Sequence, residues 1–244
     1  TLRNSSAASD VYKRQQSNRA GAFPEYAEST FAVNTSSAIP LFEFARSSNA
    51  KRVVVASTGN VYAKGDKDFY EDSPLHPNDF YSTTKIALEG IAANYSPLVP
   101  TSVVRIFGVY GIPEASVEKT PLINRLVKIA LENGARTIKG DYGLAINPMT
   151  LTDCVNGLLH IATHPELATE TVNFGGAQRI TIPEIATIVA EQTRRDVAIN
   201  QEEGESLFLC GNIAKLQSHG FSPQITPKEG IKTLIDFYES KGQH

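Results

Sequence analysis

A tyrosine and a lysine four residues apart, Tyr81 and Lys85, are the pair in this 244-residue chain best suited to proton transfer. They stand at the start of an expected helix, so both side chains project from one face and their polar ends can meet. A free tyrosine has a pKa near ~10, and a fixed ammonium nearby favours the phenolate and lowers that pKa. The spacing alone is weak evidence, because 9 Tyr and 12 Lys give roughly 0.4 such pairs by chance. A solvated helix face is the alternative interpretation.

Hydroxyl groups at the end of an expected strand strengthen the case for a site. The segment 52–56 is typical of a short buried strand, and Ser57, Thr58 and Gly59 follow it directly. An open α/β sheet presents polar groups to a ligand at the carboxyl ends of its strands. Thr58 is therefore placed to hydrogen-bond the same substrate oxygen that Tyr81 deprotonates. The alternative is an ordinary turn with local bonds between side chain and backbone.

The elements that must position these groups alternate between helical and strand patterns from Phe23 onward. Three segments have the composition of buried parallel strands, at 52–56, 102–107 and 172–176. Strands separated by helices favour a parallel sheet covered by helices. The sequence therefore predicts an α/β fold.

The helices before and after the first of these strands carry most of the expected site. A buried helix is expected over about 28–47, bent or broken at Pro40. Its expected core side chains are Phe31, Ile39, Leu41, Phe42 and Phe44. Asp79 is the expected N-cap of the helix that carries Tyr81 and Lys85.

Further helices are expected in the second half of the chain. One begins at Thr152 or Asp153 and is expected to bury Val155, Leu158, Leu159 and Ala162. Two capping boxes, at 181–184 and 226–229, each place a threonine at the N-cap and a glutamate three residues later. They predict two more helix starts.

Composition excludes several classes of function. A hydrophobic content of 41% and a charged content of 20% are typical of a globular chain, and the formal charge of −3 gives no field to hold a nucleic acid. No apolar run reaches the ~18 residues of a membrane span. Cys154 and Cys210 match no disulfide scaffold or metal spacing, so we expect no metal and a reducing, cytoplasmic setting.

Several motifs together resemble the extended short-chain dehydrogenase/reductase family, the NAD-dependent epimerase/dehydratase group. They occur in the family's order and spacing over about residues 23–240. They are V-V-V-A-S-T-G-N-V-Y (53–62), Y-S-T-T-K (81–85), V-V-R-I-F-G-V-Y-G (103–111), V-N-F-G-G (172–176) and the tail 214–238. The resemblance implies a Rossmann-like parallel sheet with a small α/β C-terminal region that binds substrate.

The resemblance also implies roles for individual residues. Tyr81 is the acid/base, Lys85 holds the nicotinamide ribose and lowers the tyrosine pKa, and Thr58 is the hydroxyl of the triad. Phe107 matches a position that lines the nicotinamide site. Asn34 matches an asparagine of the helix before the catalytic strand, although an asparagine on a helix is more often a structural hydrogen-bonding residue. The cofactor implied is NAD or NADP, and a hydride moves between a substrate carbon and the nicotinamide as tyrosine takes the hydroxyl proton.

The start of the sequence departs from the family. Members open with a strand and a glycine-rich turn that binds the cofactor pyrophosphate, and no such G-x-G-x-x-G motif occurs here. We therefore expect an N-terminally truncated chain whose sheet lacks its first strands and which is inactive by itself. Residues 1–22 are expected to be a disordered or foreign extension, with a transit peptide as the weaker alternative. Residues 23–111 then form a partial NAD(P)-binding domain, and 112–244 a substrate-binding region from which the strand 171–176 returns to the sheet.

Two further departures concern the substrate. Family members that act on nucleotide sugars often place an arginine near Ile146, where neither Ala145 nor Ile146 can grip a pyrophosphate. A diphosphate is therefore expected to bind poorly unless another cation, such as Arg179 or Arg194, takes that role. Gly108 replaces a polar residue that is frequent in the family and removes one possible substrate contact.

These observations predict an NAD(P)-dependent epimerase or dehydratase that acts on a sugar or nucleotide sugar. A carbonyl or hydroxy-compound reductase is the alternative among enzymes, and a non-catalytic ligand sensor or scaffold is the alternative of another class. The expected partner is the small-molecule substrate, with a homodimer implied by the resemblance through the helix around 81–95. The sequence does not decide between NAD and NADP, or identify the substrate.

Overall fold

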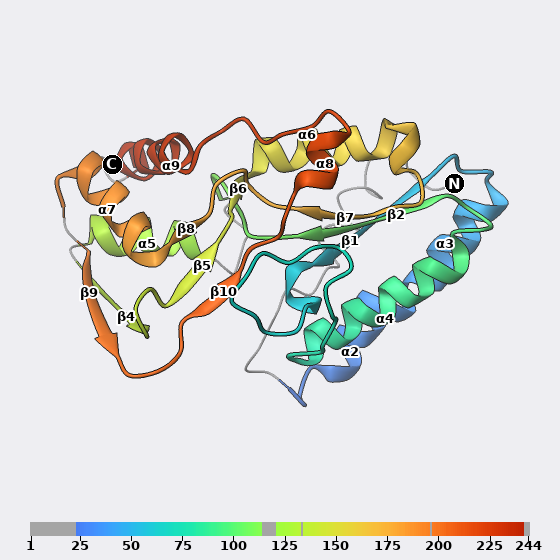
Figure 1. Ribbon diagram of the computed structural model, residues 1–244, viewed down its shortest axis with the longest axis horizontal. Helices are drawn as coiled ribbons and strands as arrows, with labels where there is room; N and C mark the ends of the chain where they lie inside the picture. Colours follow the sequence, from blue (N-terminus) through green and yellow to red (C-terminus); the bar gives the residue numbers. More distant parts are fainter. Residues whose placement is uncertain (1–22, 114–120, 133, 196, 242–244) are drawn as a thin grey trace.

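The computed structural model describes residues 23–113, 121–132, 134–195 and 197–241 (Figure 1). Its strands are β1 Val53–Thr58, β2 Thr101–Ile106, β3 Val109–Tyr110, β4 Ala135–Lys139, β5 Leu144–Ile146, β6 Met149–Thr150, β7 Thr171–Phe174, β8 Ile180–Thr181, β9 Ala198–Glu202 and β10 Leu207–Leu209. Its helices are α2 Ala27–Phe31, α3 Ala38–Ser47, α4 Phe80–Tyr95, α5 Leu122–Leu131, α6 Leu151–Thr163, α7 Ile182–Thr193, α8 Ala214–Ser218 and α9 Pro227–Lys241. Three short helical turns are η1 Ala32–Ser36, η2 Gly59–Val61 and η3 Pro165–Leu167.

A parallel sheet in the order β1-β2-β7 forms the middle layer of one half of the molecule. Helices α3 and α4 lie below this sheet and α6 above it in Figure 1. No described strand pairs with the second edge of β1. The α/β fold with a parallel sheet is confirmed, although β1 is less buried than expected because it is the edge strand of the described sheet.

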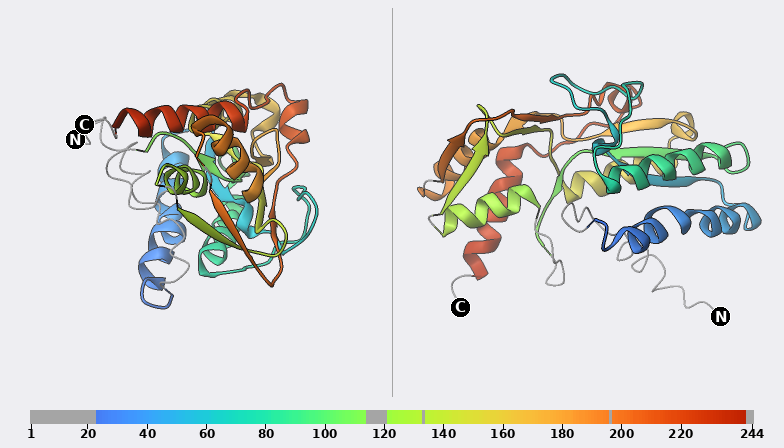
Figure 2. Two further views of the ribbon diagram at one scale, coloured as in Figure 1. Left: turned by 90° about the vertical axis from the view of Figure 1, so that its left-hand side faces the viewer. Right: turned by 90° about the horizontal axis from the view of Figure 1, so that it is seen from below.

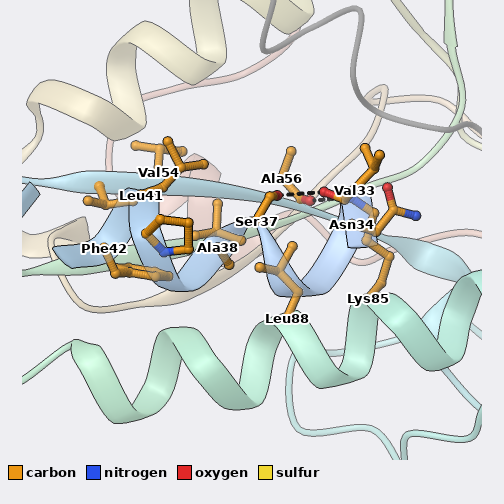
Figure 3. Close-up of a pocket in the computed structure, with 13 residues that line it drawn as sticks. Val33, Asn34, Ser37, Ala38, Leu41, Phe42, Val54, Ala56, Lys85 and Leu88 are labelled. Atoms are coloured by element: carbon orange, nitrogen blue, oxygen red, sulfur yellow. Dashed lines mark hydrogen bonds between the residues drawn. The ribbon is translucent and has the colours of Figure 1, made fainter. Parts of the chain in front are cut away.

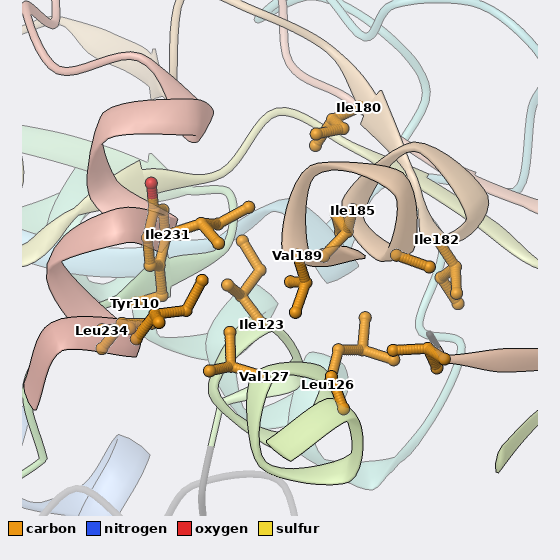
Figure 4. Packing of buried hydrophobic residues seen from close by; sticks show 14 of the residues in the cluster. Tyr110, Ile123, Leu126, Val127, Ile180, Ile182, Ile185, Val189, Ile231 and Leu234 are labelled. Carbon is orange, nitrogen blue, oxygen red and sulfur yellow. The ribbon is translucent and has the colours of Figure 1, made fainter. Parts of the chain in front are cut away.

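The other half of the molecule is built from short strands and from the helices α5, α7 and α9, which pack against one another (Figure 2). Strands β10, β5 and β8 form one small sheet, and β4 pairs with β9 in parallel. Helices α5, α7 and α9 turn their apolar faces toward one another and toward Tyr110 (Figure 4). The side chains at the centre of this cluster are Ile123, Leu126, Val127, Ile185, Val189, Ile231 and Leu234.

The expected buried helix over 28–47 is wrong in two respects. A π-helical turn, η1, separates α2 from α3, so the break precedes Pro40, which lies in the first turn of α3. Only the stripe Ala38, Phe42 and Ala45 is buried, because one face of α3 packs against α4 and β1. The other apolar side chains, Phe31, Ile39, Leu41 and Phe44, are 41–64% exposed.

The buried face of α6 was also predicted incorrectly. The helix begins at Leu151, and the Thr150 hydroxyl accepts a hydrogen bond from the backbone N–H of Asp153. The Asp153 carboxylate points inward and accepts the backbone N–H groups of 224 and 225. This anchor sets the rotation of the helix, so the buried residues are Asp153, Cys154, Gly157 and Ile161. Val155, Leu159 and Ala162 are exposed and Leu158 is half-buried.

The predicted helix starts are confirmed. Asp79 caps α4 through the backbone N–H of Ser82, and the Ser82 hydroxyl donates back toward Asp79. Both capping boxes, at 181–184 and 226–229, are formed. Side-chain caps of this kind stabilise a helix start by about 1 kcal/mol each.

Leu126→Ala tests the packing of α5, α7 and α9. Leu126 has no exposed surface, so its truncation should leave a cavity and lower the free energy of unfolding by about 2–5 kcal/mol. The matched control is Leu159→Ala on α6, where the side chain is 60% exposed and a change within about 0.5 kcal/mol is expected. Urea unfolding measures both. Equal losses in the two variants would contradict the described core.

Candidate active site

The end of β1 and the start of α4 bring the predicted triad together. Thr58 is the last residue of β1, and its side chain accepts a hydrogen bond from the backbone N–H of Asn60 and hydrogen-bonds Tyr81. The capping box at Asp79 fixes where α4 begins, so Tyr81 and Lys85 follow one turn apart on the face toward the sheet. The Lys85 Nζ lies 5.8 Å from the centroid of the Tyr81 ring.

Lys85 is an ammonium group held almost entirely inside the protein. Its side chain is 3% exposed, and Nζ donates a hydrogen bond to the carbonyl oxygen of Ala56 at 3.0 Å. Burial lowers the pKa of Lys85 to about 8, while the nearby carboxylate of Glu89 acts in the opposite direction. The amine is therefore poised to change its protonation close to neutral pH.

The Tyr81 hydroxyl has a raised pKa, so the expectation that Lys85 lowers it does not hold in this geometry. Burial raises the pKa of Tyr81 to about 12, the charge of Asp79 adds to the rise, and the hydrogen bond with Thr58 lowers it. The Lys85 ammonium donates its hydrogen bond to the carbonyl of Ala56 and not to the Tyr81 oxygen. Thr58 is thus the group here that favours the phenolate.

Asn34 ties the segment before β1 to the helix that carries the triad. It lies buried in η1, and its side-chain amide donates to the hydroxyl of Thr84 at 3.2 Å. Thr35 donates to the carbonyl of Thr84 at 3.0 Å. These hydrogen bonds hold η1 against α4 at Thr84, the residue before Lys85. They support the interpretation of Asn34 as a structural hydrogen-bonding residue.

A cavity of about 380 Å³ runs along β1 between α3 and α4. Figure 3 shows Asn34 and Lys85 at one end of it and apolar side chains such as Leu41 and Phe42 at the other. Lys85 is the charged residue of its lining, and the remaining walls are mostly apolar. A cavity with an apolar body and a few polar groups at one end is a common form of ligand site.

Phe107 is buried beside the turn that follows β1. Its ring is 1% exposed and lies between Gly59 and Gly211, where an added Cβ would come within 2.5 Å of the ring at either position. Neither position therefore accepts a larger side chain without displacing Phe107. The structure thus packs Phe107 against Gly59, the residue that follows Thr58.

The segment expected to hold an arginine carries none. Ala145 and Ile146 are buried in β5 and pair with β8. Arg179 directly precedes β8, is exposed, and lines a cavity of about 200 Å³ together with Asn147. Arg194 is the exposed C-cap of α7. Of the two cations considered from the sequence, Arg179 is the one that borders a cavity.

Within the part of the chain that the structure describes, no group of His, Cys, Asp and Glu side chains is arranged to hold a metal ion. Both cysteines are buried and free. No described helix combines the length and the apolar character of a membrane span.

Sequence reasoning missed a set of buried polar residues beside the triad. Ser57, Glu89 and Arg105 form one hydrogen-bonded group under the end of β1. The available signal was an arginine that directly follows the apolar residues of β2, Val103 and Val104, within a buried strand. A charge in such a strand requires a buried partner.

The sequence was compared with models of known protein families. The sequence model described as "NAD dependent epimerase/dehydratase family" matches residues 14–175. The chain belongs to this family. The resemblance noted in the sequence is thereby confirmed, and it includes the segments that carry Thr58, Tyr81, Lys85 and Phe107.

Curated relatives are similar over most of this chain. The uncharacterized UDP-glucose epimerase YtcB of Bacillus subtilis is 28% identical over 206 residues, with 82% of this chain and 64% of the relative covered. A UDP-glucuronate 4-epimerase of Thermodesulfobacterium geofontis is 28% identical over 216 residues, with 84% and 64% covered. The chain thus spans less than two thirds of the length of these two relatives.

Solved structures share the fold. MoeE5 in complex with UDP-glucuronic acid and NAD has a TM-score of 0.77 at 23% identity, covering 90% of this chain and 75% of that one. The UDP-glucose 4-epimerase of Thermotoga maritima has a TM-score of 0.80 at 18% identity, covering 93% and 75%. Identities this low show the fold alone, which is that of the Rossmann-type epimerases.

Lys85→Met tests the burial of the ammonium. The native pKa of about 8 lies below the ordinary value of 10.5, so below pH 8 the folded state bears the cost of a buried charge. We expect the variant to be more stable than wild type by about 1–3 kcal/mol at pH 7. Between pH 8 and 10.5 the unfolded state binds more protons, so wild-type stability rises and the difference shrinks.

Urea unfolding at a series of pH values measures this effect. The control is Lys228→Met, whose side chain is 64% exposed, and no comparable pH-dependent difference is expected there. A Lys85→Met variant whose stability differs from wild type by the same amount at every pH would contradict the shifted pKa.

Proposed function

We propose that this chain is part of an NAD(P)-dependent epimerase or dehydratase that acts on a nucleotide sugar, with Tyr81 as the acid/base. The observation that carries the proposal is the meeting of Thr58, Tyr81 and Lys85 at the carboxyl end of β1. A parallel α/β sheet presents ligand-binding groups at this end of its strands. Hydroxyl, phenol and ammonium groups together suit proton transfer on a substrate alcohol.

The proton chemistry follows from the hydrogen bonds. A substrate hydroxyl placed between Thr58 and Tyr81 gives its proton to the Tyr81 oxygen, while Thr58 orients the substrate oxygen and favours the phenolate. Lys85 is the positive group on the same side of α4. When bound, the nicotinamide supplies the chemistry that the side chains lack, the acceptance and return of a hydride.

The residues present fit the nicotinamide end of such a cofactor. The cavity along β1 places the Lys85 ammonium and the Asn34 amide at one end of an apolar channel. We propose that Lys85 and Tyr81 hold the nicotinamide ribose and that Phe107 limits the space beside the ring. We propose that further parallel strands complete the cofactor domain at the edge of β1 with which no described strand pairs, since this sequence carries no glycine-rich pyrophosphate turn.

A nucleotide sugar is the substrate class favoured by the relatives, whose names include UDP-glucose and UDP-glucuronate epimerases. Such a substrate carries a diphosphate, which binds best to a bidentate cation. We propose that Arg179 takes this role, because it faces the cavity that Asn147 also lines, while Ala145 and Ile146 are buried in β5. We further propose that 112–244, apart from the returning strand, forms the substrate-binding region.

Tyr81→Phe tests the function directly. The substitution keeps the ring in place and removes only the ionisable oxygen, so turnover should fall by about 10²–10⁴-fold. The assay is conversion of UDP-glucose or UDP-glucuronic acid by the enzyme with its complete cofactor site. Tyr95→Phe, at the far end of α4, is the control and should retain its activity. Near wild-type turnover by Tyr81→Phe would refute the assignment.

A further inference from the structure

A row of polar side chains crosses the sheet one residue before the catalytic end of β1. Ser57, Arg105 and Asn173 stand at the same register on the neighbouring strands β1, β2 and β7. All three are buried, with at most 5% of their surface exposed. Thr58 follows Ser57 directly, so this row lies immediately under the proposed site.

Glu89 of α4 contacts two members of this row, Ser57 and Arg105, from the side of the helix. Its carboxylate accepts a hydrogen bond from the Ser57 hydroxyl and is paired with the guanidinium of Arg105, where Nη2 lies 2.7 Å and Nε 3.1 Å from its two oxygens. The two side chains of this ion pair are 10% and 6% exposed. Glu89 comes four residues after Lys85, so both lie on the same face of α4.

The same guanidinium holds the loop that connects Thr58 to Tyr81. Arg105 donates from Nη1 to the Tyr62 hydroxyl and to the carbonyl of Glu71, both at 2.8 Å. Tyr62 in turn donates to the side-chain oxygen of Asn173 at 2.6 Å. Strand, loop and helix are therefore fixed to one another by a single buried network.

A buried ion pair is a poor source of stability in itself. Taking both charges out of water costs several kcal/mol, and apolar residues of similar volume often stabilise a fold equally well. Glu89 lies one helical turn beyond Lys85, so its carboxylate can stabilise the buried ammonium, which apolar residues cannot do. A carboxylate near a buried ammonium favours the charged form of the amine.

We propose that Glu89 is the positioning residue for Lys85: its carboxylate holds α4 on β1 and β2 through Ser57 and Arg105, and supplies the counter-charge for the buried ammonium. This inference depends on the proposed function in one respect only, which is that Lys85 takes part in catalysis. The charge of Glu89 opposes the lowering of the Lys85 pKa by burial, as this role requires.

The surroundings of Lys85 leave Glu89 as its main electrostatic partner. On its own helix, the titratable groups near Lys85 are Tyr81 and Glu89. Strand β1 presents the carbonyl of Ala56, and the described part of the cavity wall from η1 and α3 carries no charge. The charged residue of β2 is Arg105, and its guanidinium forms an ion pair with Glu89.

The test is an NMR titration of Lys85 in the purified chain labelled with ¹³C-lysine. The Lys85 resonance is the one that disappears in Lys85→Met. In wild type we expect a titration midpoint near the pKa of about 8. Glu89→Gln preserves the shape of the side chain and removes its charge, so the midpoint should move to lower pH by about one pH unit.

Glu89→Asp is the matched variant, because it retains the charge and shortens the side chain. If Glu89 acts as counter-charge, Asp keeps the Lys85 midpoint closer to wild type than Gln does. If Glu89 serves packing alone, Gln leaves the midpoint unchanged and Asp is the more disruptive change, and this result would overturn the proposal.

A second variant covers the case in which Glu89→Gln does not fold, since that change leaves the Arg105 charge buried without its partner. Glu89→Gln combined with Arg105→Met removes both charges and should recover the fold. Its Lys85 midpoint should still lie below wild type, and a wild-type midpoint would overturn the proposal. Because the titration needs no substrate, the expected shifts of the midpoint together with near wild-type turnover by Tyr81→Phe, in the enzyme with its complete cofactor site, would contradict the proposed function alone. An active enzyme with an unmoved midpoint contradicts this inference alone.

Discussion

The burial of one ammonium group against the end of β1 is the constraint around which the described site is built. Lys85 Nζ donates a hydrogen bond to the carbonyl of Ala56, in surroundings that lower the pKa of the amine to about 8. An amine in such a place must be supported from several elements, because burying a charge is costly. The clamp of η1 on α4 and the ion pair of Glu89 with Arg105 provide that support from two sides.

A buried polar row of this kind costs stability relative to an apolar one. Three polar residues, Ser57, Arg105 and Asn173, occupy the last position but one of parallel strands, where buried apolar side chains would pack with less cost. In return, the end of β1, the loop after it and the start of α4 are fixed relative to one another. The distances among Thr58, Tyr81 and Lys85 then depend on a network in which each member has a buried partner.

Local signals in the sequence were enough to predict where α4 begins and which residues it carries. Asp79 is a favoured N-cap residue, and the four-residue spacing then places Tyr81 and Lys85 on one face of the helix. The resemblance to the epimerase/dehydratase family also came from contiguous motifs, which the family comparison confirmed. These features depend on neighbours in the chain and not on distant contacts.

The features that the sequence did not predict depend on residues far apart in the chain. The rotation of α6 is set by the bond of Asp153 to the backbone at 224–225, whereas hydrophobic periodicity favoured Val155 and Leu159. The raised pKa of Tyr81 follows from burial and from the charge of Asp79. The burial of the Tyr81 side chain cannot be deduced from its four-residue spacing to Lys85.

The pH dependence of kcat/KM in Thr58→Val tests most directly whether Tyr81 is the ionising group of the site. The hydrogen bond with Thr58 lowers the Tyr81 pKa, so its removal should move the rising limb of the pH profile to higher pH. Thr58→Ser retains the hydroxyl and should keep the wild-type profile. A profile that is identical in wild type and Thr58→Val would contradict the account.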